Sequence, residues 1–112
     1  MTKIINENDL EFRDGDSGVK YMIRGPVLDW GFILYKSGQG LAEHYHEKTE
    51  ETFYIASGTP TFIINGEKIK MKAGDSFRLD MKDKHGIVNE SDEDCKILFI
   101  KTPYFPDDKV NI

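Results

Sequence analysis

Cysteine is nearly absent from this sequence. The single Cys95 excludes an internal disulfide and any multi-cysteine zinc or iron–sulfur site. No apolar run exceeds four residues, whereas a membrane-spanning helix needs about 20. The first residues include no apolar segment of the kind found in signal peptides. A basic excess is missing too, because 15 basic residues stand against 20 acidic ones. We therefore expect a cytoplasmic protein that binds neither nucleic acid nor membranes.

The length and composition are those of one globular domain. A chain of 112 residues falls within the usual size range of a domain and can bury a sizeable core. Hydrophobic residues make up 38% of the chain and charged residues 31%, which excludes a disordered or fibrous protein. No repeat, low-complexity stretch or linker divides the sequence. We predict one domain over residues 1–112.

Apolar and polar residues alternate with a period of two along most of the chain, which indicates β-strands. The runs at 61–64 and 68–72 flank Asn65-Gly66, a pair that supplies the positive φ angles of a type I′ hairpin turn. The strand candidates lie at 19–24, 30–36, 52–56, 61–64, 68–72, 77–81, 85–89 and 95–101. Many short strands separated by Gly, Pro, Asp and Ser predict an all-β sandwich or barrel with little helix.

Two of the three histidines lie in the sequence His44-Tyr45-His46. Residues i and i+2 of a strand share a face and lie about 6.5–7 Å apart, so two such imidazoles can converge on one ion. If residues 47–50 form a hairpin loop, Glu51 returns opposite His46 and Phe53 returns opposite His44. This register places two histidines and one glutamate on the same face.

The neighbouring acid, Glu50, has the opposite parity and would point away from the histidines. A shift of the loop by one residue would exchange Glu50 and Glu51, because the side-chain period of a strand is two. The predicted register favours Glu51 as the ligand.

The spacing around these residues resembles the first sequence motif of the cupin family. Residues 38–58 match that motif at every fixed position, which are Gly38, His44, His46, Glu51 and Gly58. A second motif at 74–89 is altered.

In this second motif Gly74, His85 and Asn89 stand in the expected places. Asp80 and Lys82 occupy the positions of the usual proline and glycine, and they can form a turn with less backbone restriction. All three histidines of the chain therefore fall on the two motifs.

The resemblance implies a double-stranded β-helix, or jelly-roll barrel, with one divalent metal held inside it. The implied ligands are His44, His46, Glu51 and His85. Three neutral imidazoles and one carboxylate suit Mn, Fe, Ni, Co, Cu or Zn. Four protein ligands on an octahedral ion leave two positions for a small molecule or oxygen.

Two functions follow from the resemblance. The first is a metal-dependent enzyme of the isomerase, epimerase or dioxygenase type that acts on a small polar metabolite. The alternative is a non-catalytic module that binds a small ligand, with or without metal. Glu50 is a candidate catalytic base, although it would have to be re-aimed to serve. Phe53 is a candidate for contact with the substrate, since the predicted hairpin places it beside His44.

The run at 95–100 is apolar on both faces of the predicted strand and therefore needs cover on both. Together with the family resemblance, this pattern predicts a homodimer.

Overall fold

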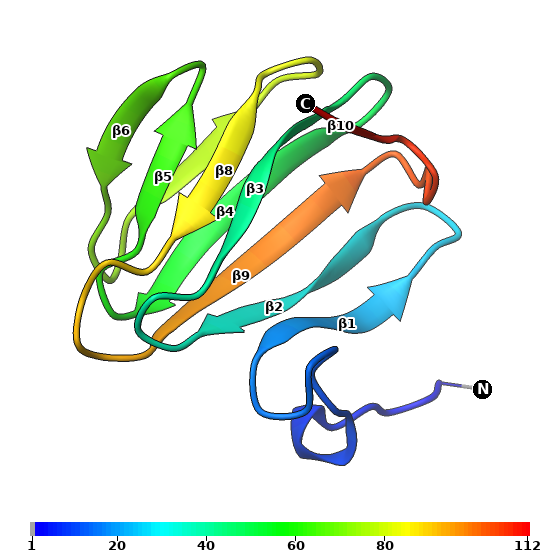
Figure 1. Cartoon of the computed structure of the whole chain (residues 1–112). Helices are drawn as coiled ribbons and strands as arrows, with labels where there is room; N and C mark the ends of the chain where they lie inside the picture. The colour runs from blue at the N-terminus through cyan, green and yellow to red at the C-terminus, as the bar shows by residue number, and fades with distance from the viewer. Residues whose placement is uncertain (1) are drawn as a thin grey trace.

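The computed structural model describes residues 2–112 and consists of two antiparallel sheets that face each other (Figure 1). One sheet has the strand order β1-β2-β9-β4-β7 and the other the order β10-β3-β8-β5-β6. Within residues 2–112 the strands are β1 (Gly18–Arg24), β2 (Asp29–Tyr35), β3 (Gly40–His46), β4 (Glu50–Ser57), β5 (Thr61–Ile64), β6 (Glu67–Lys70), β7 (Ser76–Leu79), β8 (His85–Val88), β9 (Cys95–Thr102) and β10 (Lys109–Asn111). The helical part of this region is one 3₁₀ turn, Glu7–Asp9. The predicted all-β jelly-roll barrel is confirmed.

The hydrophobic core lies between the two sheets. Alternation along β9 shows how it forms, because Cys95, Ile97 and Phe99 are buried while the residues between them are only half buried. The buried apolar side chains are Ile33, Tyr35, Phe53, Ile55, Phe62, Met71, Leu79, Ile87, Cys95, Ile97 and Phe99. Strand β8 contributes one apolar and one polar buried side chain. Ile87 belongs to the hydrophobic core, whereas His85, two residues earlier, is buried outside it.

The hairpin predicted around Asn65-Gly66 is confirmed. Strands β5 and β6 pair with Ile64 opposite Glu67, which leaves a two-residue loop between them. The loop residues have φ angles of 48° and 86°, as a type I′ turn requires.

The hairpin expected between residues 44–46 and 51–53 is wrong. Strand β3 pairs with β8 and β10, whereas β4 pairs with β9 and β7 in the opposite sheet. The backbone N–H groups of the connecting residues 47–49 donate to the carboxylate of Asp108 instead of forming a turn within one sheet. The connection therefore crosses from one sheet to the other.

A short strand near the C-terminus completes the second sheet. Strand β10 lies along β3, with Lys109 directly opposite His46 and Asn111 opposite His44 (Figure 1). No periodic pattern in the sequence predicts this strand. None of the helical structure in residues 2–112 is long and apolar enough to cross a membrane.

Candidate metal centre

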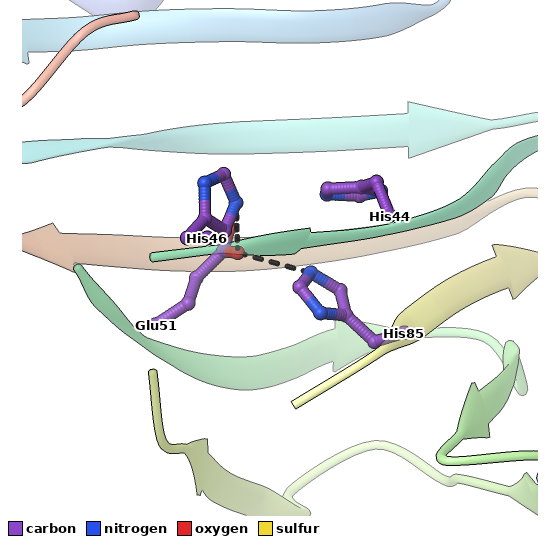
Figure 2. Close-up of side chains that lie close together, drawn as sticks. All are labelled: His44, His46, Glu51 and His85. Carbon is purple, nitrogen blue, oxygen red and sulfur yellow. Dashed lines mark ion pairs between the residues drawn. The ribbon is translucent and has the colours of Figure 1, made fainter. Parts of the chain in front are cut away.

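Four side chains from three strands meet inside the barrel (Figure 2). We call them the His/Glu cluster: His44 and His46 on β3, Glu51 on β4 and His85 on β8. One potential ligand atom from each lies within 4.8 Å of the others, and all four residues are buried. The cluster brings together the four residues that the motif spacing singles out.

The strand register explains how the cluster forms. His44 and His46 share a face of β3, and His85 stands directly opposite His44 on β8. Glu51 reaches the imidazoles from the opposite sheet. Its Oε1 lies 3.3 Å from Nε2 of His46 and 3.2 Å from Nε2 of His85. The interior-facing parity of Glu51 predicted from the sequence holds, although its route to the histidines differs.

Two atoms at the centre of the cluster have no hydrogen-bond partner. Glu51 Oε1 and His85 Nε2 are buried and make no hydrogen bond, although they lie 3.2 Å apart. Leaving buried polar atoms unpaired costs about 1–3 kcal/mol each. Their lone pairs converge on shared space, which is the arrangement that a bound cation satisfies.

Backbone carbonyls orient two of the imidazoles. The Nδ1 atom of His44 lies 3.0 Å from the carbonyl oxygen of Ala42, and Nδ1 of His85 lies 3.1 Å from that of Asp83. A carbonyl can only accept a hydrogen bond, so each Nδ1 carries the proton and each Nε2 keeps a free lone pair. Such contacts also fix ring orientation in known metal sites.

Charge in the cluster is also suited to a cation. Burial lowers the pKa of His44 to about 4, even though the Ala42 carbonyl opposes this effect, so the ring is neutral at pH 7. Burial by itself would raise the pKa of Glu51, but when the rings of His46 and His85 are protonated their hydrogen bonds and positive charge outweigh burial and lower the pKa to about 2. The cluster therefore presents an anionic carboxylate beside imidazole nitrogens, a donor set that fits first-row divalent metals.

Of the two other candidate residues, Glu50 lies away from the cluster and Phe53 packs beside it. Glu50 accepts a hydrogen bond from Nη1 of Arg78 at 2.9 Å, in a pair on the solvent-facing side of the sheet. Phe53 is only 1% exposed and packs against Phe62 and Phe77, with its ring centre 6.0 Å from that of His85. Neither residue lines the cavity beside the cluster.

A cavity of about 80 Å³ lies next to the cluster, and His44, His46 and Glu51 form part of its wall. Most of the remaining polar and aromatic residues of the wall were not predicted from the sequence; they are Arg13, Tyr21, Phe99, Lys101 and Lys109. Parity could have found two of them, because Phe99 and Lys101 follow Cys95 and Ile97 at spacings of two. Arg13 and Lys109 lie outside the predicted strands, so alternation gave no signal for them.

Comparisons with known proteins agree on the fold. The profile of the family described as "Cupin domain" matches residues 31–101. The chain is 26% identical over 76 residues to polyketide synthase CurC of Streptomyces cyaneus, which covers 68% of this chain and 49% of that protein. It is 33% identical over 63 residues to the oxalate-binding protein of Thermotoga maritima, covering 56% of this chain and 52% of the relative. The chain thus spans about half the length of these curated relatives.

A solved structure extends the likeness over nearly the whole chain. KdgF from Halomonas sp. superimposes with a TM-score of 0.81 at 20% identity, over 96% of this chain and 98% of that one. At this level of identity the likeness concerns the fold alone.

Proposed function

This chain belongs to the cupin family, and from that premise we propose that it is a metalloprotein whose His/Glu cluster holds one divalent transition metal. We propose further that it acts on a small polar metabolite by isomerase- or dioxygenase-type chemistry. The observation that carries the metal proposal is the pair of buried, unpartnered atoms, Glu51 Oε1 and His85 Nε2, 3.2 Å apart.

The residues of the cluster define what the metal would contribute. Three imidazoles and one carboxylate suit Mn, Fe, Co, Ni, Cu or Zn. When bound, such an ion supplies Lewis acidity and, if it is redox-active, electrons for oxygen chemistry. The protein's own contribution is to keep Glu51 ionised and to hold the imidazoles of His44 and His85 by their carbonyl contacts. The adjacent cavity gives a small molecule access to the cluster.

Elemental analysis tests the proposal directly. Untagged protein would be purified without nickel resin or chelator, beside the double variant His44→Ala/His46→Ala. We expect near-stoichiometric metal in the native protein and none in the variant. The absence of metal from both proteins, even after reconstitution with each of the six ions, would overturn the metal proposal.

A second candidate function is binding without turnover. The relative from Thermotoga maritima is named for binding oxalate, and the cavity here is small. A ligand that binds only the folded state raises the melting temperature. A ligand that raises the melting temperature and is recovered unchanged after incubation with metal-loaded protein would favour this candidate. Product formation would favour the enzyme.

We also propose that the chain forms a homodimer through the outer face of β9. Leu98 and Ile100 point away from the core and stay half exposed. Neighbouring strands add Trp30, which is half buried, and Tyr54, which is 45% exposed. A strand that is apolar on both faces is stabilised by cover on both. Light scattering coupled to size exclusion should give twice the chain mass, and a single Leu98→Glu substitution should give the monomer.

A further inference from the structure

Three cationic side chains line the cavity beside the His/Glu cluster: Arg13, Lys101 and Lys109. Within residues 2–112, none of the three has a carboxylate within ion-pair distance. The cavity wall contains one acidic residue, Glu51, which belongs to the cluster. A protein with a net charge of −5 has therefore gathered three positive charges against one negative charge in a single cavity.

The strand register places one lysine from each sheet next to a cluster residue. Lys101 on β9 stands directly opposite Glu51 on β4, and Lys109 on β10 stands directly opposite His46 on β3. Residues paired in this way share a face of the sheet, with β-carbons about 4.5–5.5 Å apart. Both ammonium groups are therefore carried on the interior face that bears the cluster.

Lys101 is held in place by aromatic neighbours. Its Nζ donates a hydrogen bond to Oη of Tyr21 at 2.7 Å and lies 5.0 Å and 5.8 Å from the ring centres of Tyr21 and Phe99. The buried Asp29, its partner on β2, instead accepts a hydrogen bond from the backbone N–H of Gly25. The ammonium group of Lys101 is thus oriented by neutral groups and forms no ion pair in residues 2–112.

Arg13 and Lys109 are exposed, so they stand at the open side of the cavity, whereas Lys101 is half buried. Like charges placed together destabilise one another unless an anion joins them. Within the described chain none of the three forms an ion pair, so an anion bound among them would offset the repulsion.

We propose that Arg13, Lys101 and Lys109 form an anion subsite, and that the molecule received by the His/Glu cluster is a small dicarboxylate. This inference rests on the proposed function, because it names the substrate class of the same site. One carboxylate would lie among the cations while the other faces the cluster. A cavity of about 80 Å³ suits a molecule of few non-hydrogen atoms.

The test is calorimetric titration with malonate at low ionic strength, using the protein as isolated and after chelation. Lys101→Met and Lys109→Met each remove one ammonium group while keeping the chain length of the side chain. Each should weaken malonate binding at least tenfold, the effect of one charge-assisted hydrogen bond. Lys70→Met is the matched control, because it removes the same charge from an exposed position on β6. It should leave the affinity within twofold of the native value.

Two further arms keep the proposal falsifiable. Malonamide, the neutral counterpart of malonate, should not bind, and inorganic phosphate should bind more weakly than malonate. Lys101→Arg should retain most of the affinity, which separates loss of charge from loss of fold. Equal affinity of the Lys101→Met and native proteins, or equal binding of malonamide, would overturn the subsite. Tighter binding of phosphate would overturn the dicarboxylate assignment.

Metal content separates this proposal from the one on which it rests. Lys101→Met should retain metal in elemental analysis, since Lys101 is not in the His/Glu cluster. Protein that takes up metal but binds no malonate overturns the anion subsite alone. Protein that binds malonate through the three cations but takes up no metal overturns the metal proposal alone.

Discussion

The backbone N–H of Lys82 donates to the carbonyl oxygen of His46 at 2.6 Å. This hydrogen bond ties the turn that precedes β8 to the end of β3, and so links the strands that carry His85 and His46. Lys82 makes the contact with a φ angle of 70°, in the left-handed region that favours glycine. It stands where the cupin motif usually has glycine, the residue that adopts this conformation most readily.

Replacing Lys82 by glycine should stabilise the protein. A left-handed conformation costs a residue with a β-carbon about 1 kcal/mol, and glycine adopts it freely. We expect Lys82→Gly to raise the free energy of unfolding in urea by about 0.5–1 kcal/mol. Lys84→Gly, an exposed control without a positive φ angle, should lower it by a similar amount. A decrease in both variants would show that Lys82 is not strained.

Asp108 should be the anchor of the connection between the two sheets. Its carboxylate accepts backbone hydrogen bonds from residues 47, 48 and 49, at 3.2, 2.8 and 3.0 Å. These residues join His46 to Glu51, so the anchor also sets the spacing of two cluster residues. Asp108→Ala should lower the free energy of unfolding by about 1–2 kcal/mol, because water replaces the carboxylate at exposed N–H groups.

The measurement is urea denaturation followed by a metal titration. Asp108→Ala should also weaken metal binding, since the residues between the two ligands lose their support. Asp107→Ala is the control, an exposed neighbouring acid that makes none of these three contacts. Identical stabilities of the two variants would contradict the anchoring role.

The same substitution should weaken metal binding at Glu51 and leave it unchanged at Glu50. Glu51→Gln removes the charge of the cluster at constant size and should weaken metal binding at least tenfold in a chelator competition assay. Glu50→Gln should leave metal affinity unchanged, because Glu50 pairs with Arg78 away from the cavity. If only Glu50→Gln loses metal affinity, Glu50 is the ligand and Glu51 is not.

Alkaline pH should destabilise the fold through Tyr35. Burial raises the pKa of Tyr35 to about 12, so the folded chain holds the phenolic proton after the unfolded chain has released it above about pH 10. The unfolded state then binds fewer protons, and the free energy of unfolding falls between pH 10 and 12 by up to about 2.7 kcal/mol. Urea denaturation across this range should show a shallower fall for Tyr35→Phe.

Tyr54→Phe provides the comparison, because that side chain is 45% exposed on the outer face. Its alkaline slope should match the native one. Burial also raises the pKa of the Cys95 thiol, so a smaller slope persists in Tyr35→Phe. An unchanged slope in Tyr35→Phe would exclude this residue as the source.

Short-range patterns in the sequence were enough to identify the fold class and the cluster residues. Alternation determines which side chains share a face of a strand, because successive β-carbons point to opposite sides. For that reason the inward positions of His44, His46 and Glu51 followed from parity and motif spacing. The Asn65-Gly66 turn was equally local, since its φ angles depend on two residues.

Strand pairing was decided by the tertiary structure. The alternation of side chains along a strand does not indicate which sheet the next strand joins. The connection from β3 to β4, which crosses between the sheets, was therefore predicted as a hairpin within one sheet. The cationic wall of the cavity was not predicted from the sequence for a related reason. Arg13 precedes β1, and Lys101 and Lys109 lie on strands of opposite sheets, so the three line one cavity only once both sheets are assembled. Local conformation is governed by neighbouring residues in the sequence. Strand pairing and the contacts across the cavity depend instead on how both sheets bury their apolar faces against each other.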